Sequence, residues 1–377
     1  MITNIYYLHT KIDSNIEKTV QNIIKQTQQE NIISITFFGI CFNNIYHLTL
    51  KKIKEVVYTT LNRYIPITFI PEHTVNDKNL YAEIWEINSK KSVLKLNKSL
   101  NDVHYLHIID ELYEMICIEG IPSYNNSLPL PQQCTEIFKN IKSILNKHQF
   151  TIDDIIRQWN YIGNITGHNK QNEQIYQIYN NARAEFYKEV QWPNGYPAAT
   201  GIGTDFNGII VSCIALKNNV VNKKTIYSLD NPLQVAAHIY SKEVLLGSTP
   251  NSIKETPKFE RAKLIDIADN VFCFISGTAA IRGEYSVHLQ SPQMQTELAL
   301  DNIEYLISNK NLQNNSCPEF PLEICNLRVY IKNKDHYQII RSTIEKRMPK
   351  TPAIYLFTDI CRSELLVEIE GVCQMHQ

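Results

Sequence analysis

The sequence lacks several patterns that would identify a metal-binding, membrane or nucleic-acid-binding protein. Its nine cysteines are scattered without a Cys-x-x-Cys pair, which argues against a zinc site and a disulfide framework and favours a reducing cytoplasm. No apolar stretch approaches the roughly 20 residues that span a bilayer, and the N-terminus shows no signal-peptide pattern. A formal net charge of -1 without a basic run argues against nucleic acid as a partner.

Sequence patterns that would indicate a bound metal ion or cofactor are also absent. His238 and His288 stand alone and show no metal-ligand spacing. The segment Gly201-Ile202-Gly203 is too short for a phosphate-binding loop and opens no helix. We therefore expect a cytoplasmic protein without metal or cofactor.

What the sequence does contain is an internal repeat. Residues 113–217 predict the order strand–helix–strand–helix–strand–strand, and residues 270–374 predict the same order. The spacing between matching positions drifts from 155 to 162 residues, as loop insertions would make it. The matching positions are Gly120 with Gly277, Asn140 with Asn302, and Pro197 with Pro352.

The N-terminal residues 1–112 predict a degenerate third copy. Apolar residues from Leu50 to Tyr64 recur at intervals of three and four, and strands are expected at 66–70 and 80–87. We expect an α+β fold with units at 1–112, 113–217 and 270–377, arranged around a pseudo-threefold axis. Such an axis would satisfy within one chain the interfaces that single-copy relatives form by trimerising, so a monomer is favoured over a trimer.

The connector at 218–269 contains three X-Pro turns and a short ordered element at 233–242. A connection of this length between packed units is often functional. The alternative is a surface segment that only covers the edge of a sheet, and the sequence leaves both open.

The C-terminal strand pair, at 352–357 and 365–370, carries the candidate catalytic residue. Side chains alternate along a strand, so Glu368 lies on the face opposite Val367 and Ile369. In the middle copy Ser212 takes the place of Glu368. A carboxylate among apolar residues is a candidate proton donor, whereas a single edge-strand Glu is more often only solvated. Because the copies differ at this position, we expect the cleft that contains Glu368 to be catalytic and the other clefts between units to be only structural.

Ten short motifs give a resemblance to a known family. Each copy resembles the Rid (YjgF-type) fold, and residues 113–374 resemble the chorismatases, which cleave chorismate hydrolytically. This resemblance implies tandem Rid/chorismate-mutase-like α-β units. The motifs are Arg157-Gln-Trp-Asn-Tyr-Ile, Asn-Asn-Ala-Arg183, Tyr196-Pro-Ala-Ala-Thr-Gly-Ile-Gly203, Asp230-Asn-Pro-Leu-Gln-Val235, Phe259-Glu-Arg-Ala262, Ser276-Gly-Thr-Ala, His288, Gln295-Thr-Glu-Leu-Ala-Leu-Asp-Asn302, Asp359-Ile-Cys-Arg362 and Val367-Glu-Ile-Glu370.

The resemblance implies roles for particular residues. Glu368 would protonate the enol ether of chorismate, and burial would raise its pKa for that task. Arg183 and Arg341 would bind the two carboxylates, because guanidinium forks suit carboxylates. The other residues expected at the substrate are Tyr240, Tyr179, Cys361 and Ala279. Cys361 favours 3-hydroxybenzoate as product over a dihydroxycyclohexadiene carboxylate, although a buried Cys with a purely structural role is the more common case.

Departures from the family pattern keep two alternatives open. Leu233 stands where the family has Arg, His238 where it has Tyr, and the segment 245–258 does not match the expected loop. These changes leave room for a relative that binds a small molecule without catalysis. A Rid-like imine or enamine deaminase is disfavoured because Ile354 replaces the Arg that follows Pro-Ala in those enzymes.

Overall fold

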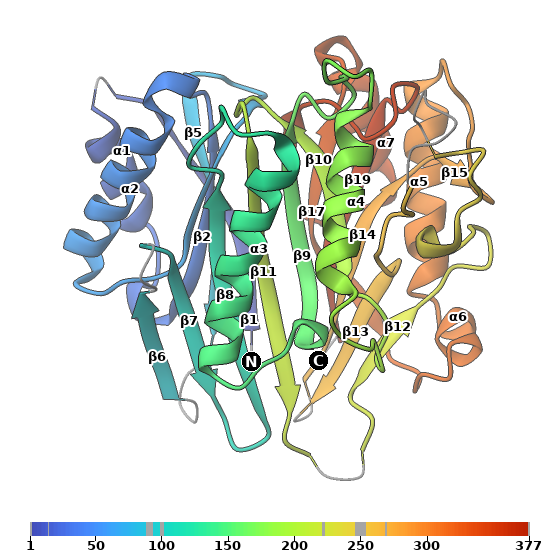
Figure 1. Ribbon diagram of the computed structural model, residues 1–377, viewed down its shortest axis with the longest axis horizontal. Coiled ribbons are helices and arrows are strands. Elements are labelled where there is room, and N and C mark those ends of the chain that lie inside the picture. The colour runs from blue at the N-terminus through green and yellow to red at the C-terminus, as the bar shows by residue number, and fades with distance from the viewer. Residues whose placement is uncertain are drawn as a thin grey trace.

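The computed structural model describes residues 2–13, 15–87, 93–98, 102–220, 223–245, 254–267 and 270–375. It contains three units with the same element order, β-α-β-α-β-β, so the α+β fold and the repeat are confirmed. In each unit the last strand lies antiparallel between the first and second strands, and the second and third strands are parallel. Figure 1 shows the three sheets side by side with the helices on the outside.

The first unit is structurally complete, although its sequence predicted only the second helix and the last two strands. Its sheet has the order β1-β5-β2-β3. The elements are β1 (Ile2–Lys11), α1 (Ile16–Ile24), β2 (Ile32–Gly39), α2 (Tyr46–Leu61), β3 (Ile67–Pro71) and β5 (Asn79–Ile87).

The second unit carries an additional hairpin, which extends its sheet to the order β10-β9-β11-β8-β7-β6. The hairpin is β6 (Val93–Lys98) and β7 (His104–Ile109). The repeated elements are β8 (Tyr113–Pro122), α3 (Leu130–Lys147), β9 (Ile155–Gly163), α4 (Ile175–Tyr187), β10 (Ala198–Thr204) and β11 (Ile209–Asn218).

The third unit is extended in the same way, with the sheet order β12-β13-β14-β19-β17-β18-β4. The repeated elements are β14 (Asn270–Ala279), α5 (Pro292–Leu306), β17 (Leu322–Ile331), α7 (Tyr337–Arg347), β18 (Ala353–Phe357) and β19 (Val367–Met375). The added elements are β4 (His73–Thr74), β12 (Ile226–Leu229), β13 (Ala262–Ile267), β15 (Ile281–Arg282), β16 (Tyr285–Ser286) and α6 (Asn309–Asn314).

The connector between the second and third units is therefore partly sheet. Its strands β12 and β13 pair with each other and then with β14, which the turn-rich sequence did not reveal. Within the segment at 233–242 the structure shows a 3-10 turn, Ala237–Ile239. None of the described helices is long and apolar enough to cross a membrane.

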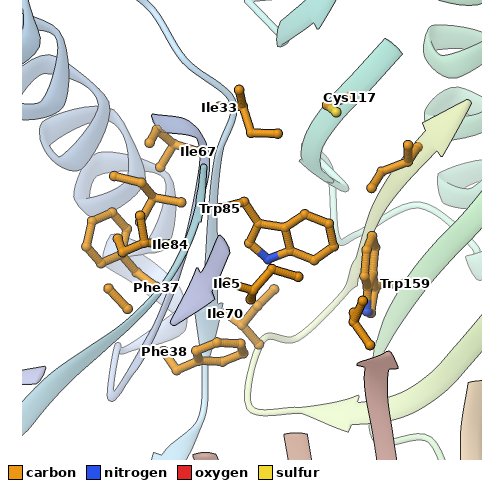
Figure 2. Packing of buried hydrophobic residues seen from close by; sticks show 14 of the residues in the cluster. Ile5, Ile33, Phe37, Phe38, Ile67, Ile70, Ile84, Trp85, Cys117 and Trp159 are labelled. Carbon is orange, nitrogen blue, oxygen red and sulfur yellow. The ribbon is translucent and has the colours of Figure 1, made fainter. Parts of the chain in front are cut away.

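The hydrophobic core has an inner part, where the three sheets face one another, and outer parts beneath the helices. Trp85 of β5 meets Trp159 of β9 edge to face, with ring centroids 5.9 Å apart, and Figure 2 shows the two indoles facing each other. Phe274 of β14 stacks on Trp85 at 6.0 Å. Aromatic side chains from all three units thus meet near the axis, and each large ring buries much apolar area.

The loops that follow the parallel strands of the three units meet at one end of the axis. The backbone N–H of Asp205 donates to Pro71, and that of Gly203 donates to Asp359. Glu72, directly after β3, is fully buried there, and its carboxylate has no well-aligned hydrogen-bond partner among the described residues. Burial and the negative charges of Asp205 and Asp359 raise the pKa of Glu72 well above its ordinary value, and the Thr358 hydroxyl offsets this only in part.

This buried acid makes a prediction about stability. The folded state holds Glu72 protonated, whereas the unfolded chain ionises it above about pH 4.3, so Glu72 destabilises the fold increasingly as pH rises. We expect Glu72→Gln to raise the free energy of unfolding at pH 7 by up to about 3 kcal/mol. The gain should shrink to nothing near pH 4, as measured by denaturant unfolding across pH.

Asp77 supplies a control of opposite sign. Burial alone would raise its pKa, but hydrogen bonds from His73 and Lys334 lower it below the ordinary value. Asp77→Asn should therefore destabilise the fold at pH 7 and lose its effect in acid. Equal pH dependence for the two variants would contradict the assignment of Glu72.

Candidate active site between the second and third units

A cavity opens between the second and third units and encloses about 730 Å³ of space, part of it open to solvent. Volumes of this order suit small-molecule sites. From the second unit it is lined by Gln174, Tyr176, Gln177, Asn180, Ala199 and Gly201. The connector contributes Tyr240, Val244, Leu245, Pro257, Phe259 and Arg261, and the third unit contributes Gly277, Ala279, Ile281, Cys361, Arg362, Leu365 and Glu368.

Glu368 is the carboxylic acid in this cavity. On β19 it pairs with Ala279 of β14 and Tyr330 of β17, while Val367 and Ile369 point into the core beneath α5 and α7. Its side chain is buried, with 4% exposure. The strand alternation read from the sequence is therefore correct at this position.

Gly277 makes room for the carboxyl group of Glu368. A Cβ atom at position 277 would overlap with Oε1 of Glu368, so any larger residue would displace the acid. The glycine is thus a close-approach position, where only the missing side chain allows the packing.

The environment of Glu368 favours its neutral form. Burial, and then the negative charge of Glu370, raise the pKa of Glu368 to about 8, against the opposing effect of Arg157 and Arg261. Among the described residues, no donor makes a hydrogen bond to its carboxylate. Glu368 therefore keeps a proton at neutral pH, as a general acid must.

Two arginines that the sequence reading did not select supply positive charge in the cavity. Arg261 donates through Nη2 to the Val235 carbonyl at 2.6 Å and to the Tyr240 hydroxyl at 2.8 Å. Its Nε is buried and has no acceptor among the described residues. Arg362 donates through Nη1 to the Glu284 carbonyl at 2.9 Å.

Tyr240 lies between these two cations. Arg261 sits 5.7 Å and Arg362 5.4 Å from the centre of its ring, so the phenol face supports both guanidinium groups. Both arginines belong to motifs that carried the family resemblance, Phe259-Glu-Arg-Ala262 and Asp359-Ile-Cys-Arg362. That membership was the available signal, but the motifs alone did not show which side chains point into a common space.

The helix α4 forms the opposite wall, and two of the expected residues stand behind this wall. Arg183 is buried and donates to the Asn180 side chain at 2.9 Å, so Asn180 reaches the cavity and Arg183 does not line it. The Tyr179 hydroxyl donates to the Asn160 side chain within the core beneath α4. Neither Arg183 nor Tyr179 lines the cavity, and each supports its wall from within.

Arg341 lies on a different surface of the molecule. It projects from α7 into solvent, with 46% of its side chain exposed, and donates to Glu345 at 2.6 Å. In the repeat α7 corresponds to α4, so it borders the third and first units rather than the second and third. The helix buries Ile340 and Ile344, and the neighbouring position 341 faces outward. The expectation that Arg341 lines this cavity is wrong.

Cys361 and Ala279 do line the cavity. Burial, together with the charge of Glu368, raises the pKa of the Cys361 thiol to about 12, so it stays protonated and is no thiolate nucleophile. Ala279 is the cross-strand neighbour of Glu368, and its methyl group leaves space beside the acid.

The departures from the family pattern lie beside the cavity. Leu233 is 37% exposed, and its N–H donates to the Asn231 side chain. His238 stacks at an angle on Tyr196, with ring centroids 5.5 Å apart. Neither residue is among those that line the cavity. Within the segment 245–258, residues 246–253 lie outside the described part of the chain.

The equivalent cleft between the first and second units holds a smaller cavity, which encloses about 420 Å³ and whose lining includes Thr68, Glu119 and Ser212. In this cleft the backbone N–H of Gly120 donates to the Thr68 hydroxyl. In the cleft between the second and third units the N–H of Gly277 donates to the Thr200 hydroxyl, so the two clefts are equivalent positions of the repeat. The carboxylate of Glu119 occupies the cleft between the first and second units, bound to Lys54 at 2.5 Å and to the backbone N–H of His104 at 2.7 Å. An internal ion pair thus stands in this cleft, whose cavity is smaller than the one between the second and third units.

Known proteins resemble this chain in sequence. A family model described as "Chorismatase FkbO/Hyg5-like, N-terminal" matches residues 83–215. A 3-hydroxybenzoate synthase from Streptomyces hygroscopicus is 32% identical over 232 residues, which are 59% of this chain and 64% of the relative. A chorismatase from the same organism is 32% identical over 222 residues, 58% of this chain and 61% of the relative. The matched part is less than two thirds of each curated relative.

The fold extends the resemblance to the whole chain. A crystal structure of a chorismatase superposes with a TM-score of 0.70 at 22% identity and covers 99% of both chains. At this identity the superposition shows a shared fold. The family model, the curated relatives and the shared fold agree with the motifs found in the sequence, so the chain is similar to the chorismatases in sequence over about three fifths of its length and in fold over nearly all of it.

Proposed function

We propose that this chain converts chorismate, and that it releases pyruvate by protonating the enolpyruvyl ether. The observation that carries this proposal is a buried Glu368, with its pKa raised to about 8, that faces a cavity lined by two arginines. The names of the curated relatives, 3-hydroxybenzoate synthase and chorismatase, support the same substrate class.

The charge of the cavity suits a dianionic substrate. Chorismate has a ring carboxylate and an enolpyruvyl carboxylate, and each requires a cationic donor once it leaves water. Arg362 and the unpartnered Nε of Arg261 supply such donors, and the amide groups of Gln177 and Asn180 line the opposite wall. We assign the carboxylate-binding role to Arg261 and Arg362, with Arg183 acting through Asn180.

The chemical step follows from the protonation state of Glu368. The acid donates its proton to the methylene carbon of the enol ether, which gives an oxocarbenium ion beside the new carboxylate. Water adds to the cationic carbon, and the ionised Glu368 accepts a proton from it. The resulting hemiketal collapses to pyruvate and the ring alcohol, with no cofactor required. Acid catalysis of this kind contributes about 10²–10⁴-fold.

For the ring product, we propose 3-hydroxybenzoate ahead of the dihydroxycyclohexadiene carboxylate. The former differs from the latter by the loss of one water, which makes the ring aromatic. Cys361 lines the cavity, and the resemblance to the chorismatases implies that a Cys at this position goes with hydroxybenzoate as product. A single chain supplies both walls of the cleft, so we propose that the monomer is active.

The first prediction tests the acid itself. Glu368→Gln keeps the shape and the hydrogen-bonding capacity of the side chain but removes the ionisable proton. We expect pyruvate release, measured by coupling to lactate dehydrogenase, to fall by at least about 10²-fold, while calorimetric binding of chorismate changes little. Wild-type protein that binds chorismate without releasing pyruvate would instead support a non-catalytic binding relative.

The second prediction concerns pH. Because Glu368 must be protonated to act, kcat/KM should be level below pH 8 and fall by about tenfold per pH unit above it. The infrared difference spectrum of wild type minus Glu368→Gln should show a carboxylic-acid carbonyl band that disappears with the same midpoint, near pH 8. A rate that rises through pH 8 would remove Glu368 from the role of acid.

The third prediction separates the arginine in the cavity from the one that the sequence favoured. Arg362→Gln removes a charge-assisted hydrogen bond to a substrate carboxylate, so KM should rise about 10- to 100-fold. Arg341→Gln removes a solvated charge on α7 and should leave KM unchanged. The reverse pattern would show that the substrate binds elsewhere.

A further inference from the structure

A second carboxylate lies close to the acid and has the opposite character. Glu370 follows Glu368 by two positions on β19, so both side chains are on the same face, about 7 Å apart along the strand. Burial alone would raise the pKa of Glu370, but Arg157 and Arg328 lower it below its ordinary value. Two neighbouring carboxyl groups are therefore kept in different protonation states.

Glu370 is fully supplied with hydrogen-bond donors. It accepts from Arg157 and Thr200, from Trp159 Nε1 at 3.1 Å, from Arg328 at 3.2 Å and from the Tyr330 hydroxyl at 2.9 Å. Glu368, in contrast, has no donor among the described residues.

Arg157 is the cation that decides between the two carboxylates. Its charge acts on Glu368 as well as on Glu370. Its guanidinium group nevertheless donates to Glu370, and it donates to the Thr200 hydroxyl at 2.8 Å. The same group lies 4.5 Å from the ring centre of Trp159. In its own sheet the cross-strand partners of Arg157 are Ala198 and Ile214, and the carboxylate that it binds, Glu370, belongs to the third unit.

Thr200 connects this arrangement to the backbone beside the acid. Its hydroxyl donates to Glu370 and accepts from Arg157 and from the N–H of Gly277 at 3.1 Å. Gly277 is the residue whose missing side chain makes room for the Glu368 carboxyl group. The Thr200 hydroxyl thus binds both Arg157 and the backbone of Gly277 beside Glu368.

We propose that Thr200 and Glu370 are positioning residues that direct Arg157 away from Glu368 and thereby keep Glu368 without a cationic partner. The proposal rests on the proposed function, in which Glu368 must donate a proton. Without the Thr200 hydroxyl or the Glu370 charge, Arg157 turns to Glu368, and Glu368 becomes an ion-paired carboxylate that cannot act as an acid.

The test is the pH dependence of isosteric variants. Thr200→Val removes only the hydroxyl, Thr200→Ser restores it, and Glu370→Gln removes the charge. In Thr200→Val we expect the basic limb of kcat/KM to move at least about one unit to lower pH, since an opposite charge nearby favours the ionised carboxyl. Thr200→Ser should return the limb to the wild-type position. Glu370→Gln should move it furthest, and Thr200→Val decides the matter if Glu370→Gln does not fold.

A merely structural role gives a different result. A structural role would lower activity by the same factor at every pH. The proposal is therefore overturned if the fall of kcat/KM at high pH has the same midpoint in Thr200→Val as in wild type. The infrared band of the Glu368 carboxyl group gives a second readout without turnover. If wild type releases no pyruvate but this band still shifts to lower pH in Thr200→Val, the proposed function fails and the positioning role stands.

Discussion

A buried chain of alternating charges joins the three units at their common axis. Glu83 of the first unit binds Arg328 of the third at 2.5 Å, Arg328 and Arg157 both bind Glu370, and Arg157 belongs to the second unit. All four residues are at most 5% exposed. Removing one member of such a group leaves a buried charge without compensation, which costs about 3–5 kcal/mol. The ion pairs therefore fix how the sheets face one another, in addition to the apolar packing around them.

The same burial makes an acid of one carboxyl group and an anion of its neighbour. Glu370 shares its site with two guanidinium groups, whereas Glu368 has a glycine and a cysteine beside it in an apolar cavity wall. Desolvation favours the neutral form of a carboxyl group, and close cations favour the charged form. A pair of carboxyl groups whose environments separate their pKa values is a recurrent basis for acid catalysis. Here the separation is a property of the interface between two units.

The sequence predicted those features that depend on local periodicity. The period of two along β19 placed Glu368 opposite Val367 and Ile369, and the element order revealed the repeat. Arg341 was placed wrongly because its apolar neighbour Ile340 faces the core of its own unit, and periodicity does not show which unit lies across a helix. Arg261 and Arg362 were missed because they come from segments that approach the cavity only in the folded chain. The first unit looked degenerate, yet it folds completely.

The two clefts described here differ in a few of the side chains that line them. Between the first and second units, Glu119 brings its own carboxylate to Lys54, and Ser212 stands in the place of Glu368. That cleft is satisfied internally, since a buried cation with a buried anion leaves no charge for a ligand to neutralise. Between the second and third units Ser276 takes the place of Glu119, and Arg261 keeps an unused donor in its Nε. Under the proposed function, an anionic substrate would complement the cleft between the second and third units, and the chemistry would belong to this one of the two clefts compared here.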